Sequence, residues 1–191
     1  MAKKSYKAYW ILGGVVLVLL LMLFWIIGTY NSLVTLDEEA NAKWANVESS
    51  YQRRFDLIPN LVETVKGAAE FEQETYLAVT EARTKWLNSQ SVGDKIAAAT
   101  EVQSALARLL VTVENYPDLK ATQNFRDLQV QLEGTENRIN VERNRYNEAV
   151  KNYNRKIRFF PSNIIANMFG FEKKNLFEAA ENADVAPSVE F

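Results

Sequence analysis

The chain of 191 residues contains no cysteine and no histidine. Disulfides, thiolate nucleophiles, Ser-His-Asp triads and zinc sites built on His or Cys are therefore excluded within one chain. The Glu-x-x-His ligands of a di-iron bundle are missing for the same reason, and neither a Walker A loop nor a Rossmann glycine motif occurs. Asp, Glu, Lys, Tyr and Ser remain for catalysis. We therefore expect a non-enzymatic protein with no catalytic residue, no metal ligand and no cofactor.

Charge is missing altogether from residues 8–28, and the run is long enough for a membrane-crossing helix, which needs about 20 apolar residues. A cleaved signal peptide is the alternative, but its apolar region is usually about 7–15 residues long and ends at small residues. We expect a basic tail over residues 1–7 and a retained transmembrane helix, a signal anchor, over residues 8–29. Its predicted anchor residues are Trp10, Leu17, Leu20, Phe24 and Trp25.

Three lysines precede the apolar run, and the first charges after it are acidic. Positive charge tends to stay on the cytoplasmic side, so we expect the N-terminus in the cytoplasm and the large C-terminal part outside it. Beyond the tail, acidic side chains outnumber basic ones. Nucleic acid is therefore not expected as a partner, because phosphate binding requires a concentrated basic face.

Proline and glycine are scarce, and apolar residues after the anchor recur at spacings of three and four, which is typical of amphipathic helices. We expect helices over about residues 31–87, 95–114, 122–159 and 162–169. Pro59 predicts a kink near residues 55–59, Gly67 is a further weak point, and Asp94 and Thr122 are candidate N-caps. The predicted fold class is all-α: an N-terminal transmembrane helix followed by a bundle of long antiparallel helices.

The third of these helices carries an apolar seam with coiled-coil-like spacing from Phe125 to Phe160, interrupted by Thr135 and Glu142. A row of asparagines runs beside this seam. Buried amides can fix the register of partner helices, so we consider the row a candidate interface between subunits, with a solvated polar face as the alternative. Its members are Asn137, Asn140, Asn144, Asn147 and Asn154.

Apolar side chains are dense just after this helix, and basic side chains are dense at its end. We expect the apolar segment to cap the bundle core, with an exposed contact patch for a partner or for the bilayer interface as the alternative. The residues of this candidate patch are Phe159, Phe160, Ile164, Phe169 and Phe171. The basic residues Arg155, Lys156 and Arg158 are read first as solvated helix-surface groups and second as contacts for lipid phosphate.

Several sequence strings resemble the LemA family of bacterial membrane proteins. They are YQRRFDLIPNLV at residues 51–62, YPDLKA at 116–121, EGTENRI at 133–139 and FPSNIIANMFGF at 160–171. The resemblance covers essentially all of the chain after the anchor. It implies a helical-bundle domain over residues 30–191 behind one transmembrane helix in the bacterial inner membrane. It implies no established enzymatic activity and no functional residues that can be carried over.

Two functions from different classes fit these observations. The first is a membrane-anchored scaffold or adaptor that acts through helix–helix contacts and self-associates. Its partners are the lipid bilayer, further copies of the chain and a membrane or envelope protein. The alternative is a membrane-surface or lipid-remodelling protein that uses its basic residues and the 159–171 segment. A hydrolase or transferase based on Asp, Glu and Tyr is the least favoured, and two convergent carboxylates in a pocket would support it.

Overall fold

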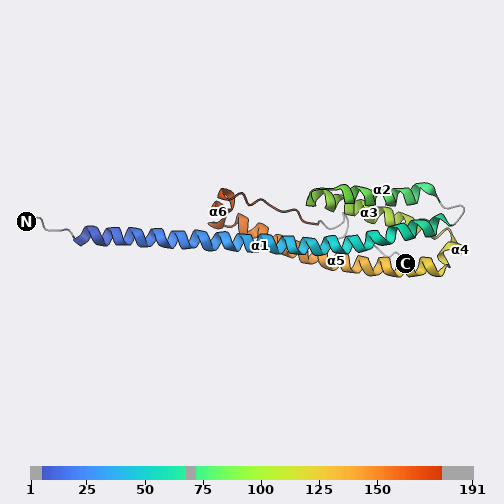
Figure 1. The fold of residues 1–191 in the computed structure, drawn as a ribbon, viewed down its shortest axis with the longest axis horizontal. Coiled ribbons are helices and arrows are strands. Elements are labelled where there is room, and N and C mark those ends of the chain that lie inside the picture. The colour runs from blue at the N-terminus through green and yellow to red at the C-terminus, as the bar shows by residue number, and fades with distance from the viewer. Residues whose placement is uncertain (1–5, 68–71, 178–191) are drawn as a thin grey trace, which may run out of the picture. The chain divides into compact units, whose positions relative to one another are not determined.

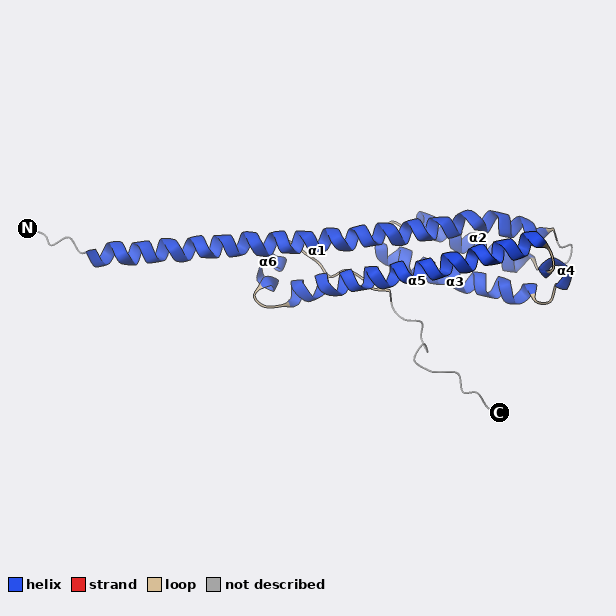
Figure 2. Ribbon diagram, turned by 90° about the horizontal axis from the view of Figure 1, so that it is seen from below, coloured by secondary structure: helices blue, strands red, loops and turns tan. Residues whose placement is uncertain are grey.

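The computed structural model describes residues 6–67 and 72–177, and these residues form helices and connecting turns with no strand (Figures 1 and 2). The predicted all-α fold class is confirmed. Lys3 and Lys4 of the basic tail and the chain end at residues 178–191 lie outside the described residues. The helices are α1 (Tyr6–Lys66), α2 (Gln73–Asn88), α3 (Val92–Val113), α4 (Pro117–Lys120), α5 (Gln123–Arg158) and α6 (Ser162–Met168).

Helix α1 joins the apolar run to the first amphipathic stripe without a break. It also continues through Pro59, where the sequence predicts a kink, and Pro59 lies on the exposed side of the helix. The prediction of one helix over residues 31–87 is wrong. Helix α1 ends at Lys66 and α2 begins at Gln73, because Gly67, a poor helix former, closes the last turn with its N–H bonded to the Glu63 carbonyl at 3.2 Å.

The later helix ends follow local capping chemistry. Helix α3 begins at Val92 rather than at residue 95, because Ser91 is its N-cap and accepts a hydrogen bond from the Asp94 N–H at 3.0 Å. Asp94 is therefore not the cap; its carboxylate instead accepts a hydrogen bond from the Ser91 hydroxyl. Thr122 does cap α5, accepting from the Phe125 N–H at 3.3 Å. Gly170 follows α6 at a φ of 74°, the left-handed conformation in which glycine commonly ends helices.

Contacts group the chain into two compact units, and α1 and α5 contribute residues to both. The first unit consists of residues 1–42 and 148–174. Its core contains Leu33 of α1, Tyr153 and Ile157 of α5, and Ile165 and Ala166 of α6. Before this core, no residue of the most apolar stretch of α1 is buried. The anchor residues Trp10, Leu17, Leu20, Phe24 and Trp25 are all exposed, as lipid-facing residues would be.

The second unit consists of residues 43–147 and 175–191. Its segments of α1 and α5 run in opposite directions (Figure 1), and α2 and α3 pack against each other as a helical hairpin. Aromatic contacts place Trp86 of α2 against Tyr51 and Phe55 of α1. Helix α3 is also long and apolar enough to cross a membrane. Its buried residues, such as Val102, Leu106 and Leu109, pack in the core of this unit.

Candidate functional site

In the first unit, an extended segment after α6 is held by Asn154 of α5. The Asn154 Nδ2 donates to the Lys174 carbonyl and its Oδ1 accepts from the Lys174 N–H, both at 2.9 Å. The Lys174 ammonium pairs with Asp37 at 3.0 Å, donates to the Asn41 amide at 2.8 Å and lies over the Tyr153 ring. Burial, and then the nearby Asp37 carboxylate, raise the pKa of Tyr153 to about 12. One lysine is thus fixed by its backbone and by its side chain.

In the second unit, Asn147 holds Phe177 in the same way. Its Nδ2 donates to the Phe177 carbonyl and its Oδ1 accepts from the Phe177 N–H, each at 2.9 Å. The Tyr146 hydroxyl donates to the Asn175 carbonyl at 2.9 Å, and burial raises the pKa of Tyr146 to about 12. Asn175 also lies against Gly93, where an added Cβ would meet its Nδ2 at 2.9 Å.

The side chain of Phe177 lies in an aromatic cluster of the second unit. The Trp44 ring stacks on it with a centroid distance of 5.9 Å, the Tyr146 ring meets it edge-on, and the Arg143 guanidinium lies 4.6 Å from its centroid. The sequence predicts the asparagine row as a candidate interface between subunits, or else as a solvated polar face. For Asn147 and Asn154 that interpretation is corrected, because a primary amide offers a donor and an acceptor and both are used on the chain's own backbone.

The remaining asparagines of the row are exposed. Asn140 bonds within α5 to Glu136 at 3.2 Å, whereas Asn137 and Asn144 belong to a second stripe on α5 in which every residue is exposed. We call this stripe the exposed α5 seam; it consists of Val130, Gly134, Asn137, Val141 and Asn144. The steps of four, three, four and three residues are those of a heptad seam, and 14 residues of helix extend about 21 Å.

In contrast to the exposed α5 seam, the apolar seam that the sequence predicts on α5 lies against other helices of the chain. Phe125, Leu128, Leu132, Ile139 and Tyr146 are buried. One polar interruption, Glu142, is buried as well and accepts from Arg145 at 2.8 Å. The coiled-coil-like seam predicted from the sequence therefore packs in the core of this chain, and the exposed α5 seam is a different face of the same helix.

Two helices of the second unit are joined by a buried ion pair between Arg54 of α1 and Glu136 of α5, whose side chains are 9% and 25% exposed. Nearby Tyr51 is buried, and this burial raises its pKa; the charge of Arg143 opposes the shift. Arg54 and Glu136 carry opposite charges that neutralise each other, and Tyr51 adds a phenol beside them. We consider the pair structural.

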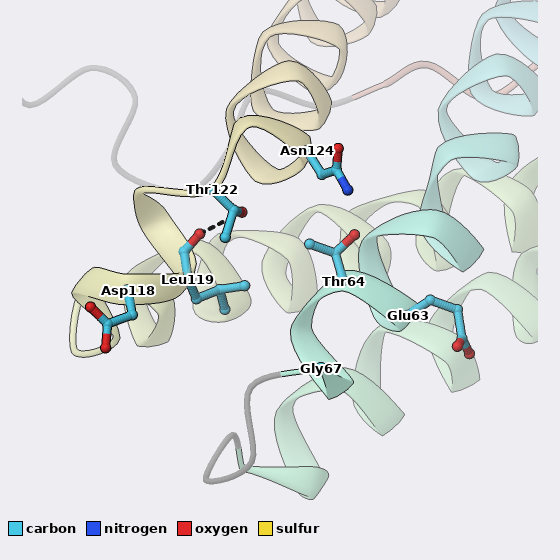
Figure 3. Close-up of a pocket in the computed structure, with 7 residues that line it drawn as sticks. All are labelled: Glu63, Thr64, Gly67, Asp118, Leu119, Thr122 and Asn124. Carbon is cyan, nitrogen blue, oxygen red and sulfur yellow. Dashed lines mark hydrogen bonds between the residues drawn. The ribbon is translucent and has the colours of Figure 1, made fainter.

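A shallow cavity of about 540 Å³ lies where residues from the end of α1, from α4 and from the start of α5 come together (Figure 3). Its carboxylates are Glu63 and Asp118, which lie at opposite sides of the view and do not point at each other. Thr122 donates to the Leu119 carbonyl at 2.8 Å. Acid–base catalysis needs groups that converge on one reacting atom, so this cavity gives no support to a hydrolase. Within the described ranges, no three carboxylates gather as metal ligands would.

The apolar segment after α5 divides between core and surface. Ile165 and Ala166 enter the core of the first unit, and half-buried Phe171 packs against that core. The expectation that the whole segment caps the core is wrong for Phe159, Phe160, Ile164 and Phe169, which are all exposed. Of these four, only Ile164 lies within α6; Phe159 and Phe160 lie in the turn before it and Phe169 directly follows it. Their exposure meets the first requirement of the alternative interpretation, and their contact with a partner or with the bilayer stays a prediction.

Comparison with known proteins finds a match to the family model described as LemA family over residues 43–191. The chain is 26% identical over 181 residues to magnetosome protein MamQ 2 of Paramagnetospirillum magneticum and 25% identical over 181 residues to MamQ of Magnetospirillum gryphiswaldense. Each match covers 81% of this chain and 66% of the relative. Protein LemA of Metamycoplasma hominis is 24% identical over 156 residues, covering 81% of this chain and 71% of the relative.

Proposed function

Because this chain belongs to the LemA family, we propose that it is a non-enzymatic, membrane-anchored scaffold whose copies associate through α5. Residues 8–29 cross the membrane once, the N-terminus lies in the cytoplasm, and the helical part lies on the other side of the bacterial inner membrane. The partners are the bilayer, a second copy of the chain and, through the scaffold, a membrane or envelope protein.

The observation that carries the proposal is the exposed α5 seam. Its two valines are exposed although they are apolar, and no charged residue interrupts the seam. Gly134 has nothing within 4 Å of the position of an added Cβ, so a partner helix can approach closely there. Asn137 and Asn144 can each donate to and accept from the same residue of a second copy, which suits a two-fold interface where one patch meets itself.

The membrane anchor supports this pairing in two ways. Copies inserted with the same orientation and related by a two-fold axis along the membrane normal present their α5 helices in parallel. Tethering also raises the effective concentration of the second copy, so that a short seam with two valines is sufficient for association. A scaffold of this kind needs no catalytic group, in keeping with the few residue types available for chemistry.

Cysteine cross-linking in native membranes tests the proposal, because the full-length chain has no cysteine of its own. Val130→Cys lies on the seam, and Val111→Cys on α3 is a matched control, since both valines are 68% exposed. We expect mild oxidation to link Val130→Cys into dimers and to leave Val111→Cys monomeric. Equal cross-linking of both variants, or of neither, would overturn pairing through α5.

The native mass of the unmodified chain in mild detergent, with co-purifying proteins identified, completes the test. A defined homo-oligomer supports self-association. A monomer bound to one foreign protein in fixed proportion would instead identify an adaptor, and the self-associating form of the proposal would be abandoned.

A further inference from the structure

Helix α6 is apolar on two opposite sides. One side packs Ile165 and Ala166 into the core of the first unit. The other side carries Ile164 and Met168, four residues apart and therefore one above the other. Phe160, in the turn before α6, is exposed as well; the exposed fractions of Ile164, Met168 and Phe160 are 53%, 61% and 80%. A helix that lies on a protein surface in water normally has a polar outer face.

The position of α6 along α1 is fixed by contacts within the first unit. Ile26 of α1 packs against the cluster that contains Ile165 and Ala166. The Tyr30 ring lies 4.8 Å from the Phe169 ring and 5.8 Å from the Phe171 ring, centroid to centroid. Both views show α6 beside α1, which continues beyond it toward the N-terminus with no other helix alongside (Figures 1 and 2).

Ile26 belongs to the last turn of the transmembrane helix predicted over residues 8–29, and Tyr30 follows that helix directly. Tyrosine and tryptophan at the end of a membrane-spanning helix favour the headgroup level. Phe169 and Phe171, which follow α6, meet Tyr30, and the cluster that contains Ile165 and Ala166 meets Ile26, so α6 lies at the level of this end of the anchor. In a chain anchored by residues 8–29, that level is the boundary between lipid and water. The apolar residues of α1 that precede Ile26 are exposed as well, among them Phe24 and Trp25.

We propose that α6, together with Phe159 and Phe160, is an interfacial membrane helix that inserts its outer face into the lipid headgroup region. The proposal rests on the membrane anchoring proposed above. Amphipathic helices of this kind bury an apolar face about 5–10 Å into the boundary region. The basic residues in the last turn of α5, Arg155, Lys156 and Arg158, then lie where lipid phosphates are, and their stems can reach along the apolar surface. Two attachments, α1 and α6, fix the orientation of the first unit against the bilayer.

Single-cysteine variants of the full-length chain test this insertion. Met168→Cys is labelled with a polarity-sensitive fluorophore and reconstituted in vesicles of phosphatidylcholine and phosphatidylglycerol. Leu17→Cys in the anchor is the positive control. Glu148→Cys is the control for water exposure within the same unit, because Glu148 is exposed and ten residues of α5, about 15 Å, separate it from Arg158. Ile164→Cys repeats the test in case the Met168 variant folds poorly.

Spin-labelled lipid is expected to quench the label at position 168 several-fold more than the label at 148, while aqueous iodide shows the reverse order. Equal iodide quenching at 168 and 148 would overturn the inference. Protection of position 168 from both quenchers would also overturn it, in favour of a protein contact. If lipid quenches position 17 but not 168, the interfacial helix alone fails; if it does not quench position 17, the anchoring itself fails.

Discussion

Asn154 and Lys174 are joined by two hydrogen bonds of 2.9 Å that satisfy one backbone N–H and one backbone carbonyl with a single side chain. An extended segment without a neighbouring strand leaves such groups to water or to side chains. The primary amide of asparagine has the same donor and acceptor as a peptide group. The Asn154 side chain therefore makes the two hydrogen bonds that a neighbouring strand would make. Asn154 is buried, and leaving its partners unpaired would therefore be costly.

Asn154→Leu is expected to release the segment around Lys174. An unsatisfied buried polar group costs about 1–3 kcal/mol, which corresponds to roughly 5–150-fold faster amide exchange if the segment opens locally. Hydrogen exchange measured by mass spectrometry on the full chain in detergent checks this over residues 171–177. Asn140→Ala is the control, because Asn140 bonds to Glu136 within one exposed helix face. Unchanged exchange in Asn154→Leu would contradict the assigned role.

The buried pair of Arg54 and Glu136 is expected to be strongly coupled. Arg54→Met leaves the Glu136 carboxylate without its counter-charge, which costs about 3–5 kcal/mol in a buried site; we expect the lower end, because Glu136 is 25% exposed. Denaturant unfolding of Arg54→Met, Glu136→Gln and the double variant measures the coupling free energy. Lys85→Met breaks an exposed pair with Glu101 and should cost only about 0–1 kcal/mol. Equal losses in Arg54→Met and Lys85→Met would contradict the buried role.

The long helices could be predicted because their signals are local. The bounds of α5 and α6 lie within one residue of those predicted, since Thr122, Pro161 and Gly170 act on neighbouring backbone. The start of α3 differs from the prediction because Ser91 and Asp94 both have capping side chains, and in a capping box the first of the two is the N-cap. The apolar stripe continues on both sides of Gly67, so periodicity alone does not indicate the end of α1.

The roles of the asparagines could not be predicted, because their partners are distant in sequence and are backbone groups. One signal was available. Asn147 and Asn154 are seven residues apart and bind residues three apart; seven helical residues rise about 10.5 Å, and three extended residues span about 10 Å. Likewise, periodicity identified an apolar stripe on α5, but burial decides which stripe a chain uses for its own core and which it leaves exposed.

Alkaline pH is expected to destabilise both units. Burial raises the pKa of Tyr146 and of Tyr153 to about 12, against about 10 in an unfolded chain. Between these values the unfolded state loses protons that the folded state keeps, so the free energy of unfolding falls as pH rises, by at most about 1.4 kcal/mol per pH unit for each tyrosine. Tyr146→Phe should make this slope shallower. A slope that is identical in Tyr146→Phe would contradict the assignment, and an ultraviolet titration of tyrosinate checks it independently.

Glu133 and Arg138 test the direction of pairing through the exposed α5 seam. If Val130, Asn137 and Asn144 occupy d positions and Gly134 and Val141 occupy a positions, then Glu133 is a g residue and Arg138 an e residue five positions later. In a parallel pair of helices these two positions face each other across the interface. Glu133→Arg then replaces two attractions per dimer with two repulsions, so we expect association to weaken by about 1–2 kcal/mol, or roughly 5–30-fold.

Arg138→Glu should weaken association to a similar extent, and the double variant Glu133→Arg with Arg138→Glu should restore it, because each exchanged charge again meets its opposite. Energy transfer between labelled full-length copies, measured as detergent dilutes the protein, gives the association constant. Glu81→Arg, exposed on α2, controls for the change in net charge. A double variant as weak as either single variant would exclude the parallel register. Any cross-link at position 130 would then require antiparallel pairing of the α5 helices. Two copies anchored in one membrane with the same orientation cannot readily form an antiparallel pair.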